Sequence, residues 1–319
     1  MKGNLEPANN SLNVLIVDDV HELLILGLRE VGHNVLYLPK ANRTEVLSKI
    51  VDQDILVVRT KTPIDAEVLG AAKKLRLIAR AGAGLDNIDL TLATELGITC
   101  TNAGEANSDA VGEHTLGMLL MLLNNLGRAH AEVKRGLWLR AANRGIELAG
   151  KTVAIIGYGN TGKAVAEKLS GFNVKVLVYD KYLKDFGSKN VVESTWAQIV
   201  QEADILSFHV PLTNETKFYL NQALIDQMEK PFFLLNLSRG KVVNTKDLLQ
   251  GLDQGKILGC ALDVLENEHL EWHNLEEKKW FERLINRENV VLTPHIGGWT
   301  KESYAKISQV LLTKLLTFR

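Results

Sequence analysis

The chain of 319 residues has little of several features that would define its class. Its only two cysteines, Cys100 and Cys260, both lie in apolar stretches, so we expect reduced thiols in a cytoplasmic protein and no disulfide framework. The formal net charge is −1, so there is no overall field that would attract nucleic acid or an anionic membrane, and neither is expected as a partner. Any anionic ligand must therefore be held by local cations.

The sequence also lacks a long apolar run. The richest apolar stretch, LGMLLMLL at 116–123, is far shorter than the roughly 20 residues that span a bilayer. Residues 1–13 lack the apolar core of a signal peptide. The length and the ordinary balance of apolar and charged residues predict a globular protein of two domains.

Short β-rich runs alternate with helical segments from one end of the chain to the other. The first series of runs covers 13–18, 34–38, 55–59, 75–80 and 98–102. The second series, nearly continuous in apolar residues, covers 152–157, 174–180, 205–210, 232–238, 258–264 and 290–295. This alternation predicts an α/β fold whose parallel sheets are covered on both faces.

Two helical regions matter for the organisation of the chain. Residues 108–138 are expected to form one long helix that crosses from the first domain to the second. Residues 301–318 carry apolar side chains at three- and four-residue steps, which predicts an amphipathic helix with Thr300 as its N-cap.

The glycine pattern in GYGNTG (157–162) predicts a dinucleotide-binding turn, because it follows an apolar strand and opens a helix. Gly157 permits a tight turn, and Gly159 lets a pyrophosphate approach the backbone. Gly162 lets helix and strand pack closely, and the helix N-terminus receives the phosphates.

Asp180 ends the strand that follows this helix. Its carboxylate can accept hydrogen bonds from an adenosine ribose and would repel a 2′-phosphate. NAD is therefore the expected cofactor, although the neighbouring Lys181 weakens the preference over NADP.

Polar residues stand at or just after the ends of the later strands: Arg239, Asp263, Glu268 and His295. The carboxyl ends of strands are where ligands bind in an open α/β sheet. Removing a hydride from a hydroxyl-bearing carbon requires a base, and histidine has a suitable proton affinity. A carboxylate can orient the imidazole, and a guanidinium can hold a substrate carboxylate and polarise a carbonyl. The set predicts hydride transfer to a nicotinamide.

Four motifs in order, GYGNTG with YD, NLSRG, ALDVxxxE and TPHIGG, resemble those of the D-2-hydroxyacid dehydrogenase family over nearly the whole chain. The resemblance implies that Arg239, Glu268 and His295 are catalytic and that Asp263 lies near the nicotinamide carboxamide. The cofactor site expected from the motifs and the resemblance comprises Gly157, Tyr158, Gly159, Asn160, Thr161, Gly162, Asp180, Lys181, His209, Val210, Pro211, Thr216, Leu237, Ser238, Asp263, Gly297 and Gly298. No metal is predicted.

The resemblance also implies an architecture and an assembly. We expect two doubly wound parallel-sheet domains with the reaction in the cleft between them. A flavodoxin-like substrate domain would comprise 1–103 and 296–319, and a Rossmann NAD domain 104–295. A homodimer is implied, with Arg140 reaching the neighbouring subunit.

The first domain carries VVRTKTPID at 57–65 and IARAGAGLDNIDL at 78–90, and NAGEANSDAVGEHTLG follows at 102–117. These segments are similar to the D-3-phosphoglycerate dehydrogenase branch of the family. Backbone N–H groups of the turn Ala81, Gly82, Ala83 and Gly84 can bind a carboxylate. Three cations near strand ends, Arg59, Lys61 and Arg80, suit a phosphate at the far end of the substrate. The expected reaction is oxidation of 3-phosphoglycerate to 3-phosphohydroxypyruvate, in serine biosynthesis. The competing interpretation is that Arg59 and Arg80 merely pair with acids such as Asp86 or Asp89.

The sequence departs from the family pattern after the catalytic glutamate. His269 replaces the usual proline, and Leu265 stands where an aromatic residue is common. The segment 266–289 is longer and more charged than usual, and its role is unexplained. The chain ends soon after HIGGWT, which predicts a short form without a regulatory domain.

Other interpretations stay open at this point. The substrate could be another D-2-hydroxyacid system, such as glyoxylate, hydroxypyruvate or D-lactate. A non-catalytic NAD-sensing protein, like the corepressor members of the family, is a rival of a different class. His209 competes with His295 as the catalytic histidine, and His114 is expected to be a packed helix residue.

Overall fold

The computed structural model describes residues 11–318. They form two compact units: the first ends at Asn107 and resumes at Trp299, and the second runs from Ser108 to Gly298. The expected domain boundaries lay at 103/104 and 295/296, and the substrate role given to the first domain stays a prediction. Residues 1–10, most of the segment in which no signal peptide was expected, lie outside the described residues.

The first unit alternates strands and helices. Its elements are β1 (Asn13–Ile16), α1 (Glu22–Glu30), β2 (Asn34–Tyr37), α2 (Arg43–Lys49), the 3₁₀ turn η1 (Ile50–Asp52), β3 (Ile55–Val58), α3 (Ala66–Ala71), β4 (Leu77–Arg80), α4 (Leu90–Glu95), β5 (Thr99–Asn102) and α12 (Lys301–Thr317). The strands form a parallel sheet in the order β2-β1-β3-β4-β5. This order is that of flavodoxin-like folds, and its direction reverses between β1 and β3, the position at which such sheets bind ligands.

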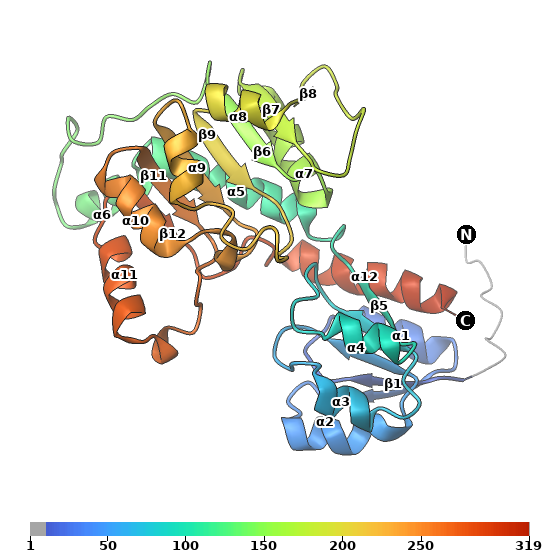
Figure 1. The fold of residues 1–319 in the computed structure, drawn as a ribbon. Helices are drawn as coiled ribbons and strands as arrows, with labels where there is room; N and C mark the ends of the chain where they lie inside the picture. The colour runs from blue at the N-terminus through green and yellow to red at the C-terminus, as the bar shows by residue number, and fades with distance from the viewer. Residues whose placement is uncertain (1–10, 319) are drawn as a thin grey trace. The chain divides into compact units, whose positions relative to one another are not determined.

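Helices cover both faces of this sheet (Figure 1). Alternate strand residues point to opposite faces, so Val14 and Ile16 of β1 pack with α1 and α12, while Leu15 packs with α2 and α3. The C-terminal helix is thus part of the first unit. Its N-cap is Thr300, whose side chain accepts a hydrogen bond from the amide of Ser303, as the sequence predicted.

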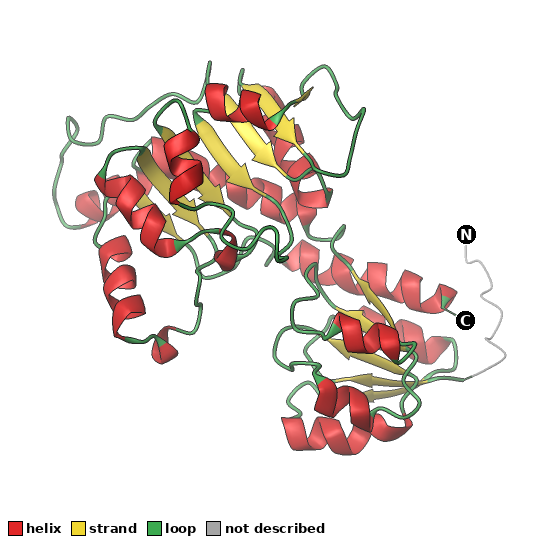
Figure 2. Ribbon diagram, in the orientation of Figure 1, coloured by secondary structure: helices red, strands yellow, loops and turns green. Residues whose placement is uncertain are grey.

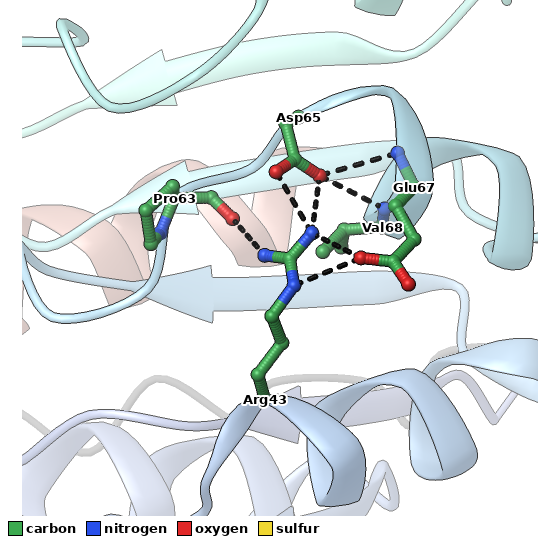
Figure 3. Close-up of polar contacts among 5 residues, drawn as sticks. All are labelled: Arg43, Pro63, Asp65, Glu67 and Val68. Atoms are coloured by element: carbon green, nitrogen blue, oxygen red, sulfur yellow. Dashed lines mark hydrogen bonds and ion pairs between the residues drawn. The ribbon is translucent and has the colours of Figure 1, made fainter.

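Arg43 ties α2 to the start of α3 (Figure 3). Its guanidinium lies 2.7 Å from a carboxylate oxygen of Asp65, the N-cap of α3, and 2.6 Å from one of Glu67. These side chains are exposed, and exposed ion pairs contribute little to the free energy of unfolding. The network therefore orders the surface of these two helices more than it stabilises the fold.

The second unit carries the larger sheet. Its elements are α5 (Ser108–Leu123), α6 (Leu126–Lys134), β6 (Thr152–Ile156), α7 (Asn160–Lys168), η2 (Leu169–Gly171), β7 (Lys175–Tyr179), β8 (Val192–Glu193), α8 (Trp196–Glu202), β9 (Ile205–Phe208), α9 (Gln222–Gln227), β10 (Phe232–Asn236), η3 (Gly240–Val242), α10 (Thr245–Asp253), β11 (Ile257–Leu262), η4 (Leu270–Trp272), α11 (Leu275–Ile285) and β12 (Val290–Leu292).

These strands form a parallel sheet, whose strands are drawn as yellow arrows in Figure 2. Their order is β12-β11-β10-β9-β6-β7-β8. Val153 and Ile155 of β6 pack with α5 and α7 on one face. Ala154 and Ile156 pack with α8, α9 and α10 on the other. Chain direction reverses between β6 and β9, which predicts a ligand site at the ends of these two strands. The α/β fold class predicted from the sequence is confirmed.

One element differs from its prediction. The helix expected over 108–138 is two helices, α5 and α6, both in the second unit. Asn125 between them has φ 53°, a left-handed conformation that ends the helical hydrogen bonding and that asparagine tolerates better than most residues. The apolar run 111–123 ends just before this break, and Leu126 and Val133 beyond it are 54% and 51% exposed, so α6 does not continue the buried face of α5.

Candidate active site

His295 follows β12 and pairs with Glu268 from the loop after β11. Imidazole Nδ1 lies 2.9 Å from Glu268 Oε2. An ionised carboxylate can only accept, so Nδ1 carries the proton and Nε2 keeps its lone pair. Both side chains are nearly half exposed, at 46% for His295 and 42% for Glu268. The two side chains that the sequence analysis expected to act together are therefore paired, and their role as a catalytic base and its partner stays a prediction.

The backbone that carries His295 is held by Asp263, which follows β11. The Asp263 carboxylate accepts hydrogen bonds from the amides of Ile296 and Gly297, at 2.9 and 2.8 Å. Its carbonyl accepts one from the amide of His295 at 2.8 Å. His295 itself has φ 56°, in the left-handed region. This conformation costs free energy, and the contacts of Asp263 stabilise it.

The Asp263 carboxylate is buried, with 2% of the residue exposed. Burial favours a higher pKa, but the approach of His114, the hydroxyl of Thr293 and the two amides outweigh it, so the pKa of Asp263 lies below the ordinary aspartate value. The ionised carboxylate of Asp263 therefore holds the turn at His295 to Gly297 through its hydrogen bonds. A direct contact between Asp263 and a nicotinamide stays a prediction.

Two residues around Asp263 were not among the predicted site residues. Thr293 donates its hydroxyl to Asp263 Oδ1 at 2.6 Å. His114 on α5 places Nε2 3.1 Å from the Thr293 hydroxyl and 3.6 Å from Asp263 Oδ1. His114, expected only to pack its helix, therefore belongs to the polar cluster under His295. The sequence did contain a signal for Thr293, which is a polar residue at the end of the apolar strand in VVLTPH.

Arg239 follows β10 in a loop that Asn236 organises. Asn236 is fully buried, accepts hydrogen bonds from the amide and hydroxyl of Ser238, and donates to the carbonyl of Arg239 at 3.0 Å. The Arg239 guanidinium donates to the carbonyl of Ser238 at 2.7 Å. Asn236 too was missed, although it interrupts the apolar run FFLLNLS.

The arginine loop and the glutamate loop pack against each other. A Cβ at Gly240 would collide with the backbone carbonyl of Leu265, so these two segments are in direct backbone contact. The structure thus brings the loops of Arg239 and Glu268 together, and it pairs Glu268 with His295. A meeting of all three side chains at one substrate stays a prediction.

The glycine turn after β6 fits a dinucleotide. Gly157 has φ 94°, and a Cβ there would lie 2.5 Å from the carbonyl oxygen of His209, at the end of β9. A Cβ at Gly162 would collide with the carbonyl of Gly157, whereas one at Gly159 would meet open space. Gly159, at the N-cap of α7, therefore leaves room where a pyrophosphate would meet the helix N-terminus.

Asp180 follows β7 and stabilises the same turn. It accepts hydrogen bonds from the amide of Tyr158 at 2.7 Å and from those of Tyr182 and Leu183 at 2.9 and 3.0 Å. Burial favours a higher pKa, but these three amides outweigh it and hold the pKa of Asp180 below its usual value. A carboxylate can accept about four hydrogen bonds, so capacity for one ribose hydroxyl is left. Its neighbour Lys181 pairs with Glu215 at 2.6 Å.

His209 has the character of a structural residue. It is 9% exposed, its Nε2 lies 2.7 Å from the hydroxyl of Ser207, and burial lowers its pKa to about 4. A ring that stays neutral in this way, behind the glycine turn, shapes the loop. That loop continues through Val210 to Thr216, whose hydroxyl donates to the carbonyl of Pro211 at 2.6 Å.

In the first unit, Arg59 follows β3 at the reversal point of the sheet. Its amide donates to Asp18 after β1 at 2.5 Å, and its guanidinium lies 4.3 Å from the ring centroid of Trp299. Burial lowers the pKa of Arg59. Lys61 is different, because its ammonium donates to the carbonyls of Val17 and Pro39 at 2.8 and 2.9 Å. Lys61 thus has a structural task beside its predicted role in substrate binding.

Arg80 ends β4 and packs against the small-residue turn. A Cβ at Gly82 would collide with the Arg80 guanidinium, so glycine leaves the space that this group fills. The predicted carboxylate-binding turn, Ala81 to Gly84, therefore lies against a cation. The side chain of Arg59 contacts the carbonyl of Asp19 and the rings of Trp299 and Tyr304. The alternative that Arg59 and Arg80 merely pair with acids such as Asp86 or Asp89 stays open.

Two further observations concern metal ligands and membrane-spanning helices. Within the described part of the chain, no group of three or more His, Cys, Asp or Glu side chains is placed to hold a metal ion. Among residues 11–318, no helix is long and apolar enough to cross a membrane.

The second unit combines three features on one doubly wound sheet: the buried carboxylate of Asp263, the imidazole–carboxylate pair and the dinucleotide turn. This combination is typical of nucleotide-dependent dehydrogenases. The family model described as "D-isomer specific 2-hydroxyacid dehydrogenase, NAD binding domain" matches residues 116–297. The chain therefore belongs to the D-isomer specific 2-hydroxyacid dehydrogenase family, and its second unit is the NAD-binding domain of that family.

Known relatives fall into more than one branch. The chain is 38% identical to a D-3-phosphoglycerate dehydrogenase of Methanocaldococcus jannaschii, over 92% of this chain and 54% of that protein. It is 34% identical to a glyoxylate reductase of Pyrococcus furiosus, over 87% and 82%. The chain thus spans about half the length of the phosphoglycerate dehydrogenases that it matches.

The fold is shared with solved structures. A D-lactate dehydrogenase from Aquifex aeolicus, complexed with NAD and lactic acid, superposes with a TM-score of 0.81 and 26% identity, over 95% of this chain and 94% of that one. The two-sheet α/β architecture is therefore that of the family.

Proposed function

We propose that the protein transfers a hydride between NAD and carbon 2 of a D-2-hydroxyacid, with His295 as the acid–base group. The observation that carries the proposal is the pairing of His295 Nδ1 with Glu268 Oε2 at 2.9 Å, above a turn anchored by Asp263. In oxidation, Nε2 accepts the hydroxyl proton, and the Glu268 carboxylate stabilises the imidazolium that forms. In reduction, the same proton returns to the carbonyl oxygen.

The remaining roles follow from the cofactor and from the charge of the substrate. Bound NAD supplies the acceptor for the hydride. Arg239 binds the substrate carboxylate and polarises the C2 oxygen by charge-assisted hydrogen bonds. The turn at Gly157 to Gly162 and the N-terminus of α7 hold the pyrophosphate. Asp180 favours NAD over NADP, and the pairing of Lys181 with Glu215 supports this, because it reduces the cation available to a 2′-phosphate.

For the substrate we propose 3-phosphoglycerate, which is converted to 3-phosphohydroxypyruvate in serine biosynthesis. Support comes from the phosphoglycerate dehydrogenase relatives and from two cations, Arg59 and Arg80, at strand ends of the first unit. Reduction of glyoxylate or hydroxypyruvate is the second candidate. It is favoured by the relatives of those names and by the engagement of Lys61 with two backbone carbonyls.

A homodimer in the cytoplasm completes the proposal. The dimer is supported by the exposed apolar side chains of Leu137, Trp138 and Leu139, with Trp138 83% exposed, beside Arg140. A monomeric mass in light scattering would contradict it. The cytoplasmic location is supported by the two free thiols, and cell fractionation would test it.

The proposal is tested by absorbance at 340 nm with the purified chain. NAD is mixed with 3-phosphoglycerate, D-glycerate and D-lactate, and NADH with glyoxylate and hydroxypyruvate. We expect NADH to form fastest with 3-phosphoglycerate. Faster turnover of glyoxylate or hydroxypyruvate selects the second candidate. NAD binding without turnover of any acid would contradict catalysis and favour a sensing protein.

A further inference from the structure

The segment 266–289, whose role the sequence left unexplained, is built against the loop that carries Glu268. It contains η4 and α11, and α11 begins with a capping box. Asn274 accepts hydrogen bonds from the amides of Glu276 and Glu277, and the carboxylate of Glu277 accepts one in return from the amide of Asn274 at 2.8 Å. The start of this helix is therefore a well-defined fixed point.

From that fixed point, Glu277 reaches the loop. Its second oxygen, Oε1, accepts a hydrogen bond from the side-chain amide of Asn267 at 3.1 Å. Hydrogen bonds from the Asn274 amide and from Asn267 hold the pKa of Glu277 below its ordinary value, so the carboxylate stays ionised at neutral pH. Asn267 immediately precedes Glu268, so the bond restrains the backbone next to the catalytic carboxylate.

His273 holds the same residue from another direction. Only 8% of His273 is exposed, and its Nε2 lies 3.0 Å from the carbonyl oxygen of Asn267. A carbonyl only accepts, so Nε2 donates, and the neutral ring has its lone pair on Nδ1. That Nδ1 is buried and has no hydrogen-bond partner among residues 11–318. A buried nitrogen without a hydrogen-bond partner lowers the stability of the fold. We therefore attribute the position of the ring to its hydrogen bond with Asn267.

The other side of the loop is anchored as well. Glu266 accepts a hydrogen bond from the amide of Thr245, at the start of α10, at 3.0 Å. The side-chain oxygen of Asn267 accepts one from the amide of His269 at 3.1 Å. Glu268 is thus an exposed residue whose neighbours on both sides are restrained.

We propose that His273 and Glu277 are positioning residues, which hold Asn267 so that the Glu268 carboxylate meets Nδ1 of His295. The inference rests on the proposed function, because it assigns a purpose to the Glu268–His295 pair. In this chain α11 does what a rigid proline after the glutamate would do, since His269 stands there instead. A displacement of about 1 Å in a catalytic group can cost about 100-fold in rate.

The test compares His273→Ala and His273→Gln with the wild-type chain, with the acid that the absorbance assay selects. We expect kcat to fall by about 10- to 100-fold in His273→Ala, with the KM for NAD unchanged. The limb of the kcat profile that His295 controls, the acid limb in oxidation and the alkaline limb in reduction, should move to lower pH, because an imidazolium without its carboxylate partner loses its proton more readily. His273→Gln keeps an amide donor and should recover most of the rate.

A second pair of variants covers the case in which His273→Ala does not fold. Glu277→Ala removes the bond to Asn267, and Glu276→Ala, one residue away on the exposed helix surface, is the matched control. We expect the loss of kcat and the shifted pH limb in Glu277→Ala and wild-type behaviour in Glu276→Ala. Thermal unfolding shows which variants are folded.

Glu268→Gln and His295→Ala are measured in parallel to separate the two proposals. If they lose activity while folded His273→Ala and Glu277→Ala keep both kcat and the pH limb within twofold of wild type, the positioning role is wrong and the proposed function stands. If Glu268→Gln and His295→Ala also retain wild-type rates, the proposed function itself is wrong.

Discussion

At the scale of single residues, His295 carries the strongest prediction. His295→Ala removes the group that accepts the hydroxyl proton, so kcat should fall by at least about 100-fold, the usual contribution of general acid–base catalysis. Steady-state turnover of the selected acid measures this, with NAD binding by fluorescence as the control for folding. Near-wild-type turnover in a folded variant would contradict the assignment.

His209 predicts how stability depends on pH. Its folded pKa of about 4 lies below the usual value of 6.5, so the unfolded chain binds the proton first. The contribution is therefore fully present above about pH 6.5 and is lost as the pH falls toward 4, by up to roughly 3 kcal/mol. Urea unfolding between pH 4.5 and 7 should show a weaker pH dependence in His209→Gln. His130 is exposed, so His130→Gln should keep the wild-type pH dependence. If the free energy of unfolding changed equally with pH in all three proteins, the role assigned to His209 would be wrong.

The sequence allowed the prediction of the paired residues His295 and Glu268 better than of the residues that support them. His295 and Glu268 stand at strand ends in polar motifs, and their pairing follows once the strands are parallel neighbours. Asn236, Thr293 and His114 interrupt apolar runs and gain their meaning only from tertiary contacts. The left-handed backbone of His295 also has no signature in residue type.

At the scale of elements, the glycines of the turn after β6 have two separate roles, one in packing and one in NAD binding. Gly162→Ala brings a Cβ against the Gly157 carbonyl, so both the free energy of unfolding and NAD affinity should fall, the first by about 1–3 kcal/mol. Gly159→Ala meets open space and should weaken NAD binding while leaving thermal stability unchanged. Thermal unfolding and NAD titration measure both. Equal stability loss in the two variants would show that the distinction is wrong.

Strands were predictable because continuous apolar runs with polar ends mark a sheet covered on both faces. The helix break at Asn125 was not, because it depends on the left-handed backbone of one asparagine, a conformation that the residue type permits but does not fix. A helical segment was expected between the strand runs at 258–264 and 290–295, but the role of the charged segment 266–289 was left unexplained and α11 was not located within it. Its capping box, Asn274 with Glu277, was a local signal that could have located its start.

At the scale of the whole molecule, the proposed function assigns binding of the acid to the first unit and binding of the cofactor to the second. Arg59→Ala should raise the KM for 3-phosphoglycerate by about tenfold or more, because a charge-assisted hydrogen bond contributes about 1.5–3 kcal/mol. The KM for NAD and for D-glycerate should change little. Lys61→Ala, which loses two bonds to backbone carbonyls, should lower thermal stability instead. An unchanged preference for the phosphorylated acid in Arg59→Ala would contradict a phosphate role.

The α/β class, the parallel sheets and the family could all be predicted from motif order and strand alternation. The substrate could not, because phosphoglycerate, glyoxylate and hydroxypyruvate share the atoms that His295 and Arg239 would contact. They differ at their far ends, where Arg59 and Arg80 are the candidates to discriminate between them.

The positive φ of His295 has a consequence for how this protein can be altered. Glycine would adopt that backbone conformation at lower free energy than any residue with a Cβ. At position 295, stability would therefore favour glycine, whereas the proposed catalysis requires histidine. Selection for thermal stability alone is therefore expected to favour glycine at this position, so a screen for stabilised variants needs a measurement of activity at every round.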